Sequence, residues 1–209
     1  MIAILAAAAL ASTCAPDETR VQQASQTRVV QAMDEPHFWA IVDRTAVHES
    51  DPDRQVEALR SELTALTAEE VLAFRNAFEA QLARAYTWDL WAVAYVAHGG
   101  ASDDGFEYFR RWMVSRGRAV FEHLLAHPDD LPNMLVADVE GVLEFEEILY
   151  VTNDVWGEKT GQTGDAMPAG PVSLTPGREP RGEPFDEDPE HLAQRLPKTW
   201  ARFGNRPLG

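Results

Sequence analysis

Apolar residues recur every three or four positions through most of the chain from residue 33 onward, with polar residues between them. This spacing is typical of amphipathic helices, whose apolar stripe faces a core. The segments that show it are 38–47, 56–66, 67–82, 88–98, 102–116, 117–127, 134–156 and part of 185–203. The pattern predicts a mainly α protein, a compact single-domain helical bundle with about six or seven helices and a long C-terminal loop.

Local signals mark several helix ends. Thr67 stands three residues before Glu70, which predicts a capping box in which each side chain binds the other's backbone N–H. The segment 88–98 is apolar nearly all round, as in a buried central helix. Gly99 follows it and predicts a left-handed C-cap. Ser102 can then cap the next helix, with two acidic residues in its first turn.

Four regions follow from these patterns. Residues 33–158 are predicted to form a helical core domain. Residues 159–184 are rich in Gly, Pro and Thr, which predicts a flexible loop. Residues 185–203 regain a helical pattern and are predicted to pack on the core. Residues 1–32 read as a disordered, signal-like or mis-called N-terminal extension.

The N-terminal extension leaves localisation open. An apolar run over residues 2–11 precedes Cys14, as in a lipoprotein signal, but no Lys or Arg precedes the run. One alternative is therefore a protein that is exported or lipid-anchored through Cys14. The favoured alternative is translation from Met33, which gives a cytoplasmic protein.

The net charge of the chain limits the classes of binding partner that we expect. The chain holds 34 acidic and 18 basic residues, a formal net charge of −16. Residues 1–32 hold two of each kind, so residues 33–209 carry the whole excess. Such a surface repels phosphate backbones, so we expect no nucleic acid partner. A basic protein partner fits this charge. We also expect no integral membrane segment, because no apolar run reaches the roughly 18 residues that a spanning helix needs.

One stretch identifies a family. Residues 86–91 read Tyr-Thr-Trp-Asp-Leu-Trp, residues 99–110 read Gly-Gly-Ala-Ser-Asp-Asp-Gly-Phe-Glu-Tyr-Phe-Arg, and Trp112 and Gly117 follow. This pattern resembles the domain-of-unknown-function 4240 family of uncharacterised bacterial proteins. Ala101 stands where that family often has cysteine, and Arg111 where it often has glycine. The resemblance implies no reaction and carries over no catalytic residue.

The same stretch holds the strongest candidates for a site. Carboxylates at Asp103, Asp104 and Glu107 could hold a divalent cation, because hard cations prefer oxygen ligands. Arg110 could bind a carboxylate or phosphate. The alternative is a capped helix in which Ser102 is the N-cap and Glu107 pairs with Arg110 or Arg111. The second interpretation explains every residue with ordinary helix physics.

A second candidate is Asp89, which lies between Trp88 and Trp91 on the apolar segment. A carboxylate there must be paired, or its pKa must rise. A raised pKa would suit a general acid or base. Pairing with Arg84 or Arg110 would instead be structural.

These observations favour a non-enzymatic, acidic protein-interaction domain, immunity-like or inhibitor-like, that binds a basic partner. The alternative is a small metal-dependent or hydrolase-like enzyme built on the carboxylates of the two motifs. We predict no cofactor and no metal ligands. The candidate binding residues are Trp88, Asp89, Trp91, Ser102, Asp103, Asp104, Glu107, Tyr108 and Arg110.

Overall fold

The structure is a computed structural model that describes residues 31–135, 141, 143–173, 175, 177 and 179–209. The predicted mainly α fold is confirmed: these residues form ten α-helices and no strand. The predicted N-terminal extension, with Cys14, lies outside the described residues except for its last two positions.

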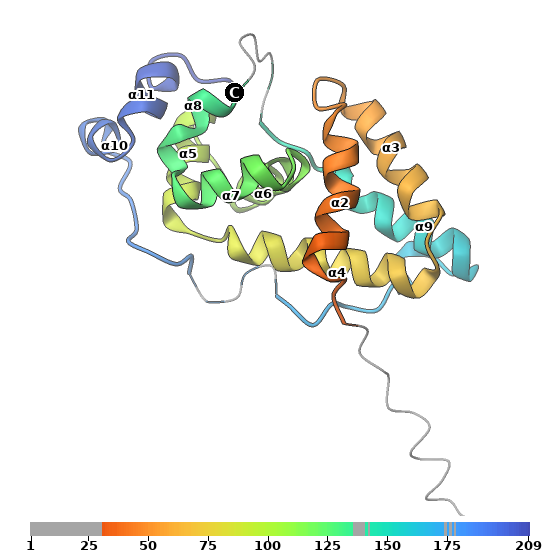
Figure 1. Cartoon of the computed structure of the whole chain (residues 1–209). Coiled ribbons are helices and arrows are strands. Elements are labelled where there is room, and N and C mark those ends of the chain that lie inside the picture. Colours follow the sequence, from red (N-terminus) through yellow and green to blue (C-terminus); the bar gives the residue numbers. More distant parts are fainter. Residues whose placement is uncertain (1–30, 136–140, 142, 174, 176, 178) are drawn as a thin grey trace, which may run out of the picture.

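The helices form two groups that share one core (Figure 1). Helices α4 and α9 contact each other, and α3 contacts both α2 and α9. The second group lies around α5 and carries the C-terminal helices. The first group is α2 (Glu35–Ala46), α3 (Pro52–Thr64), α4 (Ala68–Arg84) and α9 (Tyr150–Thr160). The second is α5 (Trp88–His98), α6 (Asp103–Ser115), α7 (Arg118–Ala126), α8 (Leu131–Met134), α10 (Pro189–Arg195) and α11 (Pro197–Phe203).

The predicted helix ends of the central region are confirmed. The Glu70 N–H donates to Thr67 Oγ1 at 3.2 Å, and the Thr67 N–H donates to Glu70 Oε2 at 2.8 Å. Gly99 has φ +74°, the left-handed conformation that a C-cap requires. Ser102 Oγ accepts from the Gly105 N–H at 3.1 Å and starts α6.

The prediction of one continuous helix over residues 134–156 is wrong, although residues 150–156 are helical; residues 136–140 and 142 lie outside the described part of the chain. α8 ends at Met134, residues 143–146 are not helical, and α9 begins only at Tyr150 after a short 3-10 turn. Tertiary bonds explain the break. The Leu143 N–H donates to His98 Nε2 at 3.0 Å, and the Phe145 N–H donates to the Tyr108 carbonyl at 3.2 Å. These two N–H groups donate to residues of α5 and α6 instead of to carbonyls of a preceding helical turn. The side chains of Leu143 and Phe145 are both buried.

The number of helices is also higher than the six or seven predicted, partly because the C-terminal segment splits in two. Leu196, with φ −129° and ψ 62°, separates α10 from α11. Pro197 follows it, and the ring of a proline disfavours helical geometry at the residue before it. Both short helices pack back: α11 contacts α5 and α8, and Leu192 and Leu196 are buried.

The described part of the segment between α9 and α10 passes along α4 (Figure 1). Arg75 of α4 donates to the Pro168 carbonyl, and Met167 is buried. Farther on, the Arg181 N–H donates to the Tyr86 carbonyl at 3.1 Å, and the Trp88 N–H donates to the Arg181 carbonyl at 2.9 Å. This segment therefore reaches the start of α5, where the candidate residues lie.

Candidate functional site

A stack of aromatic rings joins α5 to α6. The Trp88 and Trp91 rings lie 5.4 Å apart at 15°, and the Trp91 and Phe106 rings lie 4.8 Å apart at 14°. Trp91 Nε1–H donates to the Ala101 carbonyl at 3.0 Å, which satisfies the one polar group of its ring. Both tryptophans are half-buried, whereas Phe106 is fully buried. The stack therefore runs from the surface into the core.

Arg110 continues the stack inside the protein. Its guanidinium lies 4.9 Å from the Phe106 ring centroid and 5.0 Å from that of Tyr86. Nη1–H donates to the Leu82 carbonyl at 2.9 Å, and only 1% of the residue is exposed. Burial lowers the pKa of Arg110 to about 10, and the nearby Glu107 charge opposes that fall. Arg110 therefore stays charged at neutral pH.

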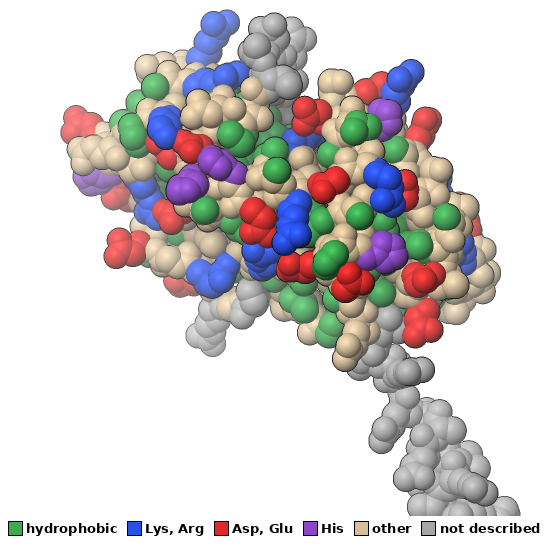
Figure 2. Space-filling model, in the orientation of Figure 1, with side chains coloured by type: hydrophobic (Ala, Val, Ile, Leu, Met, Phe, Trp, Pro, Cys, Tyr) green, Lys and Arg blue, Asp and Glu red, His purple; other side chains and the backbone are tan. Residues whose placement is uncertain are grey.

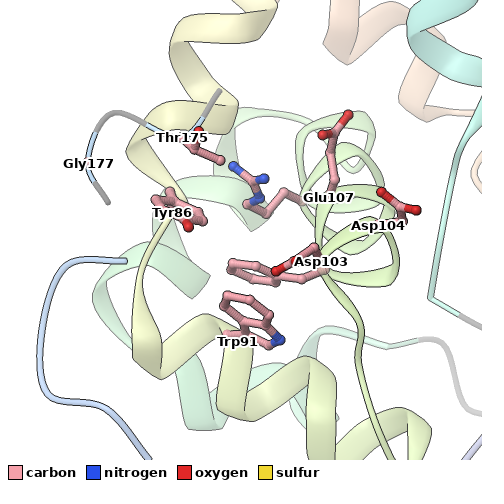
Figure 3. A pocket seen from close by; sticks show the side chains of 9 residues that line it. Tyr86, Trp91, Asp103, Asp104, Glu107, Thr175 and Gly177 are labelled. Atoms are coloured by element: carbon pink, nitrogen blue, oxygen red, sulfur yellow. The ribbon is translucent and has the colours of Figure 1, made fainter. Parts of the chain in front are cut away.

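A cavity of about 350 Å³ opens beside this stack (Figure 3). Aromatic side chains, Arg110 and acidic residues of α6 all contribute to its lining. It brings together five of the nine predicted residues. The lining residues are Tyr86, Trp91, Asp103, Asp104, Phe106, Glu107, Arg110, Thr175 and Gly177.

The three carboxylates of the cavity do not gather around one point. Asp103 and Asp104 are exposed in the first turn of α6, as the capping interpretation predicts. Glu107 is bound to Arg111 at 2.5 Å, the predicted ion pair along the helix. Figure 3 shows the carboxyl group of Asp103 near the rings and that of Glu107 at a distance from it. Within the described ranges, no group of three or more His, Cys, Asp or Glu residues could hold a metal ion.

Asp89 lies outside the cavity, and the expected partners Arg84 and Arg110 are wrong. Its side chain is exposed, and Oδ1 accepts from Arg195 at 2.7 Å (Nη2) and 3.1 Å (Nε). Arg195 also donates to the carbonyls of Glu183 and Pro184. The ion pair therefore fastens the C-terminal segment to the start of α5. The arginine lies 106 residues away in sequence, so nothing local in the chain pointed to it.

The same C-terminal segment covers the outer aromatic face of α5. The Phe185 ring lies 5.9 Å from Trp88 and 5.4 Å from Tyr95, with edge or tilted geometry. Burial raises the pKa of the Tyr95 phenol, and the nearby Glu187 carboxylate raises it further. Trp88 therefore packs under Phe185 and does not line the cavity.

Tyr108 belongs to a second cluster on the far side of α6. The Arg111 guanidinium lies 5.3 Å from the Tyr108 ring centroid and 5.2 Å from that of Tyr150. The hydroxyls of Tyr108 and Tyr150 each donate to Glu146 Oε1 at 3.0 Å. The bond from Tyr108 to Glu146 raises the pKa of Tyr108 to about 12. Arg111, which stands where the resembled family was expected to have glycine, therefore holds this cluster together.

Sequence reasoning missed one pair of chemically active side chains. His123 and His127 have the i, i+4 spacing at the end of α7, and their rings lie 5.2 Å apart. That spacing was a usable signal. It also missed Thr175 and Gly177, which reach the cavity from a segment with no periodicity.

The fold and the cavity define an all-α protein with an aromatic and acidic pocket beside its central helix. The sequence pattern of the DUF4240 family, described as a protein of unknown function, matches residues 33–158, more than half of the chain. The chain belongs to this family. No curated protein and no solved structure matches it. None of the helices in the described residues is long and apolar enough to cross a membrane.

Proposed function

We propose that this protein is a non-enzymatic interaction domain of the inhibitor or immunity type, which binds a basic protein partner through the cavity beside α5 and α6. One observation carries the proposal: the lining of the cavity combines aromatic rings with carboxylates. Aromatic faces attract cations, and nearby carboxylates add charge attraction. An arginine or lysine side chain of a partner has the matching chemistry.

Two arginines of the protein itself already pack against aromatic rings in this way. The Arg110 guanidinium lies against the rings of Tyr86 and Phe106, and the Arg111 guanidinium lies against those of Tyr108 and Tyr150. The cavity lining holds three acids against the single cation of Arg110, so its net charge is negative. The cavity is near the lower end of the usual range for ligand sites, which suits one side chain better than a large molecule.

Overall charge supports a basic partner but does not select a face. On the face seen in Figure 2, acidic side chains are spread among Lys and Arg side chains. The net charge of −16 would raise the association rate with any basic protein. Specificity would come from the cavity, where charge and aromatic rings meet.

The alternative enzyme gains no support from this geometry. Asp89 is engaged by Arg195, and Glu107 is engaged by Arg111. The carboxylates proposed to act together therefore have separate structural partners.

The test uses a fluorescent hexa-arginine peptide and its hexa-citrulline analogue, which keeps the shape of arginine but has no charge. We expect the full chain to bind only hexa-arginine, with affinity that falls as salt rises. Asp103→Asn together with Asp104→Asn should weaken binding about fivefold, which corresponds to about 1 kcal/mol for two exposed charge contacts.

The matched control is Asp53→Asn with Glu57→Gln, two exposed acids on α3. It removes the same charge from the other group of helices and should change affinity less than twofold at physiological salt, because screening limits charge effects to about 8 Å. An equal loss in both double variants would move binding away from the cavity. Absence of hexa-arginine binding, together with a pulldown that recovers no basic protein, would contradict the whole proposal.

A further inference from the structure

A pair of histidines lies where α7 meets the following turn, away from the cavity lining. His123 belongs to the last turn of α7, and His127 follows Ala126, the last residue of the helix. The His127 N–H still donates to the His123 carbonyl at 2.8 Å, so the helical register continues through His127. Residues four apart in a helix lie on the same side, and the two rings are 5.2 Å apart at 50°.

This separation matches a chelate. Imidazole nitrogens bind Zn²⁺ at about 2.0–2.1 Å, so two imidazoles on one tetrahedral ion have centroids roughly 5 Å apart. Paired histidines with i, i+4 spacing are a recurrent zinc-binding arrangement on helices.

Asp130 fixes the protonation of His123. Its Oδ2 lies 2.9 Å from His123 Nε2, and its Oδ1 binds Lys198 of α11. A carboxylate that forms an ion pair with the Lys198 ammonium is ionised and can only accept hydrogen bonds. Nε2 of His123 therefore carries the proton, and a neutral ring keeps its lone pair on Nδ1. A carboxylate on the second nitrogen is the usual support of a metal-binding histidine.

We propose that His123 and His127 form a chelating site for a transition-metal cation of the Zn²⁺, Cu²⁺ or Ni²⁺ type. His123 binds through Nδ1, His127 through one ring nitrogen, and water fills the other positions. Imidazole suits these metals, whereas Mg²⁺ and Ca²⁺ prefer oxygen ligands. The site has two protein ligands. It therefore does not conflict with the absence, among the described residues, of any group of three or more possible metal ligands.

The surroundings allow access and hold balanced charge. The His123 side chain is 37% exposed, and His127 is exposed. Glu122, beside His123, is paired with Arg84, and Asp129 accepts the N–H groups of Lys198 and Thr199 at the start of α11. Lys198 is bound by Asp130. An arriving metal ion therefore meets no unbalanced positive charge among these groups.

The experiment is calorimetric titration of the untagged full chain with Zn²⁺, Cu²⁺ and Mg²⁺ at pH 7.5. His127→Ala is the central variant, because the His127 side chain makes no hydrogen bond or ion pair within the described part of the chain, so the fold should survive its loss. We expect one saturable site for Zn²⁺ and Cu²⁺, none for Mg²⁺, and at least tenfold weaker binding in His127→Ala and in His123→Ala.

Two controls separate the site from unspecific binding. His37→Ala, a single exposed histidine on α2, should leave the affinity unchanged. Asp130→Asn should weaken binding about tenfold, the usual effect of removing the partner of a metal-binding histidine. Equal affinity in the His127→Ala variant, or no saturable binding of any of the ions, would overturn the proposal.

Discussion

Gly117 offers the sharpest test of how the fold is held together. It joins α6 to α7 with φ +88° and ψ 169°, a conformation that is essentially restricted to glycine. A Cβ at this position would lie 2.7 Å from Asp43 Oδ1 of α2. That oxygen accepts the Arg118 N–H at 2.8 Å. A side chain at residue 117 would therefore strain the backbone and displace the group that fastens the start of α7 to α2.

We predict that Gly117→Ala lowers the free energy of unfolding by about 2–4 kcal/mol. The strained backbone costs about 1–3 kcal/mol, and the weakened hydrogen bond to a carboxylate adds about 1 kcal/mol. This is a large share of a domain's usual 5–15 kcal/mol. The assay is urea unfolding of the full chain, followed by tryptophan fluorescence and circular dichroism.

Two further variants separate the causes of this loss. Gly161→Ala is the control, because Gly161 has φ +71° but no atom within 4 Å of an added Cβ. It should lower the free energy of unfolding only by the cost of a left-handed backbone conformation for alanine, about 1–2 kcal/mol. Adding Asp43→Ala to Gly117→Ala should show coupling of at least about 0.5 kcal/mol. A loss below about 1 kcal/mol for Gly117→Ala would refute the reasoning, because neither term would then be present.

Two more predictions concern the ends of α5. His98 Nε2 accepts the Leu143 N–H, and burial lowers the pKa of His98, so the neutral ring is favoured in the folded state. Its contribution to stability should be complete above pH 6.5 and should fall as pH drops through that value. Between pH 7.5 and 5, the free energy of unfolding in urea should therefore decrease less for His98→Asn than for the unchanged protein. An identical decrease in both would count against this prediction. Asp89→Asn should change global stability by less than about 1 kcal/mol, because the pair with Arg195 is exposed. It should nevertheless speed tryptic cleavage after Arg181 and Arg195, whereas the control Asp103→Asn should not. Equal cleavage rates in Asp89→Asn and the unchanged protein would mean that the ion pair does not hold the segment.

Several local features could be predicted because they depend on residues close in sequence. The Thr67–Glu70 capping box, the left-handed Gly99 and the Ser102 cap each involve at most four consecutive residues. Such motifs satisfy backbone groups that every helix leaves open at its ends. The ion pair between Glu107 and Arg111 is equally local. These parts of the candidate site were therefore readable before any tertiary structure.

Errors arose where distant groups compete with local preference. The apolar spacing over residues 134–156 suits a helix, yet the amides of Leu143 and Phe145 bind His98 and the Tyr108 carbonyl. The partner of Asp89 could not be predicted either, because many arginines are compatible with one carboxylate. Only the path of the chain after α9 brings Arg195 to it.

The sequence by itself determined the helical class, most helix ends of the central region, the family and the acidic character of the chain. Periodicity, capping chemistry and composition act over a few residues or over the whole chain, so they can be read without knowing the fold. Tertiary structure alone decided which candidates share the cavity, that Trp88 packs against Phe185 and Asp89 pairs with Arg195, and that Arg110 is buried against the Tyr86 and Phe106 rings. A side chain's environment depends on segments up to about a hundred residues away, and their placement is set by packing of the whole core.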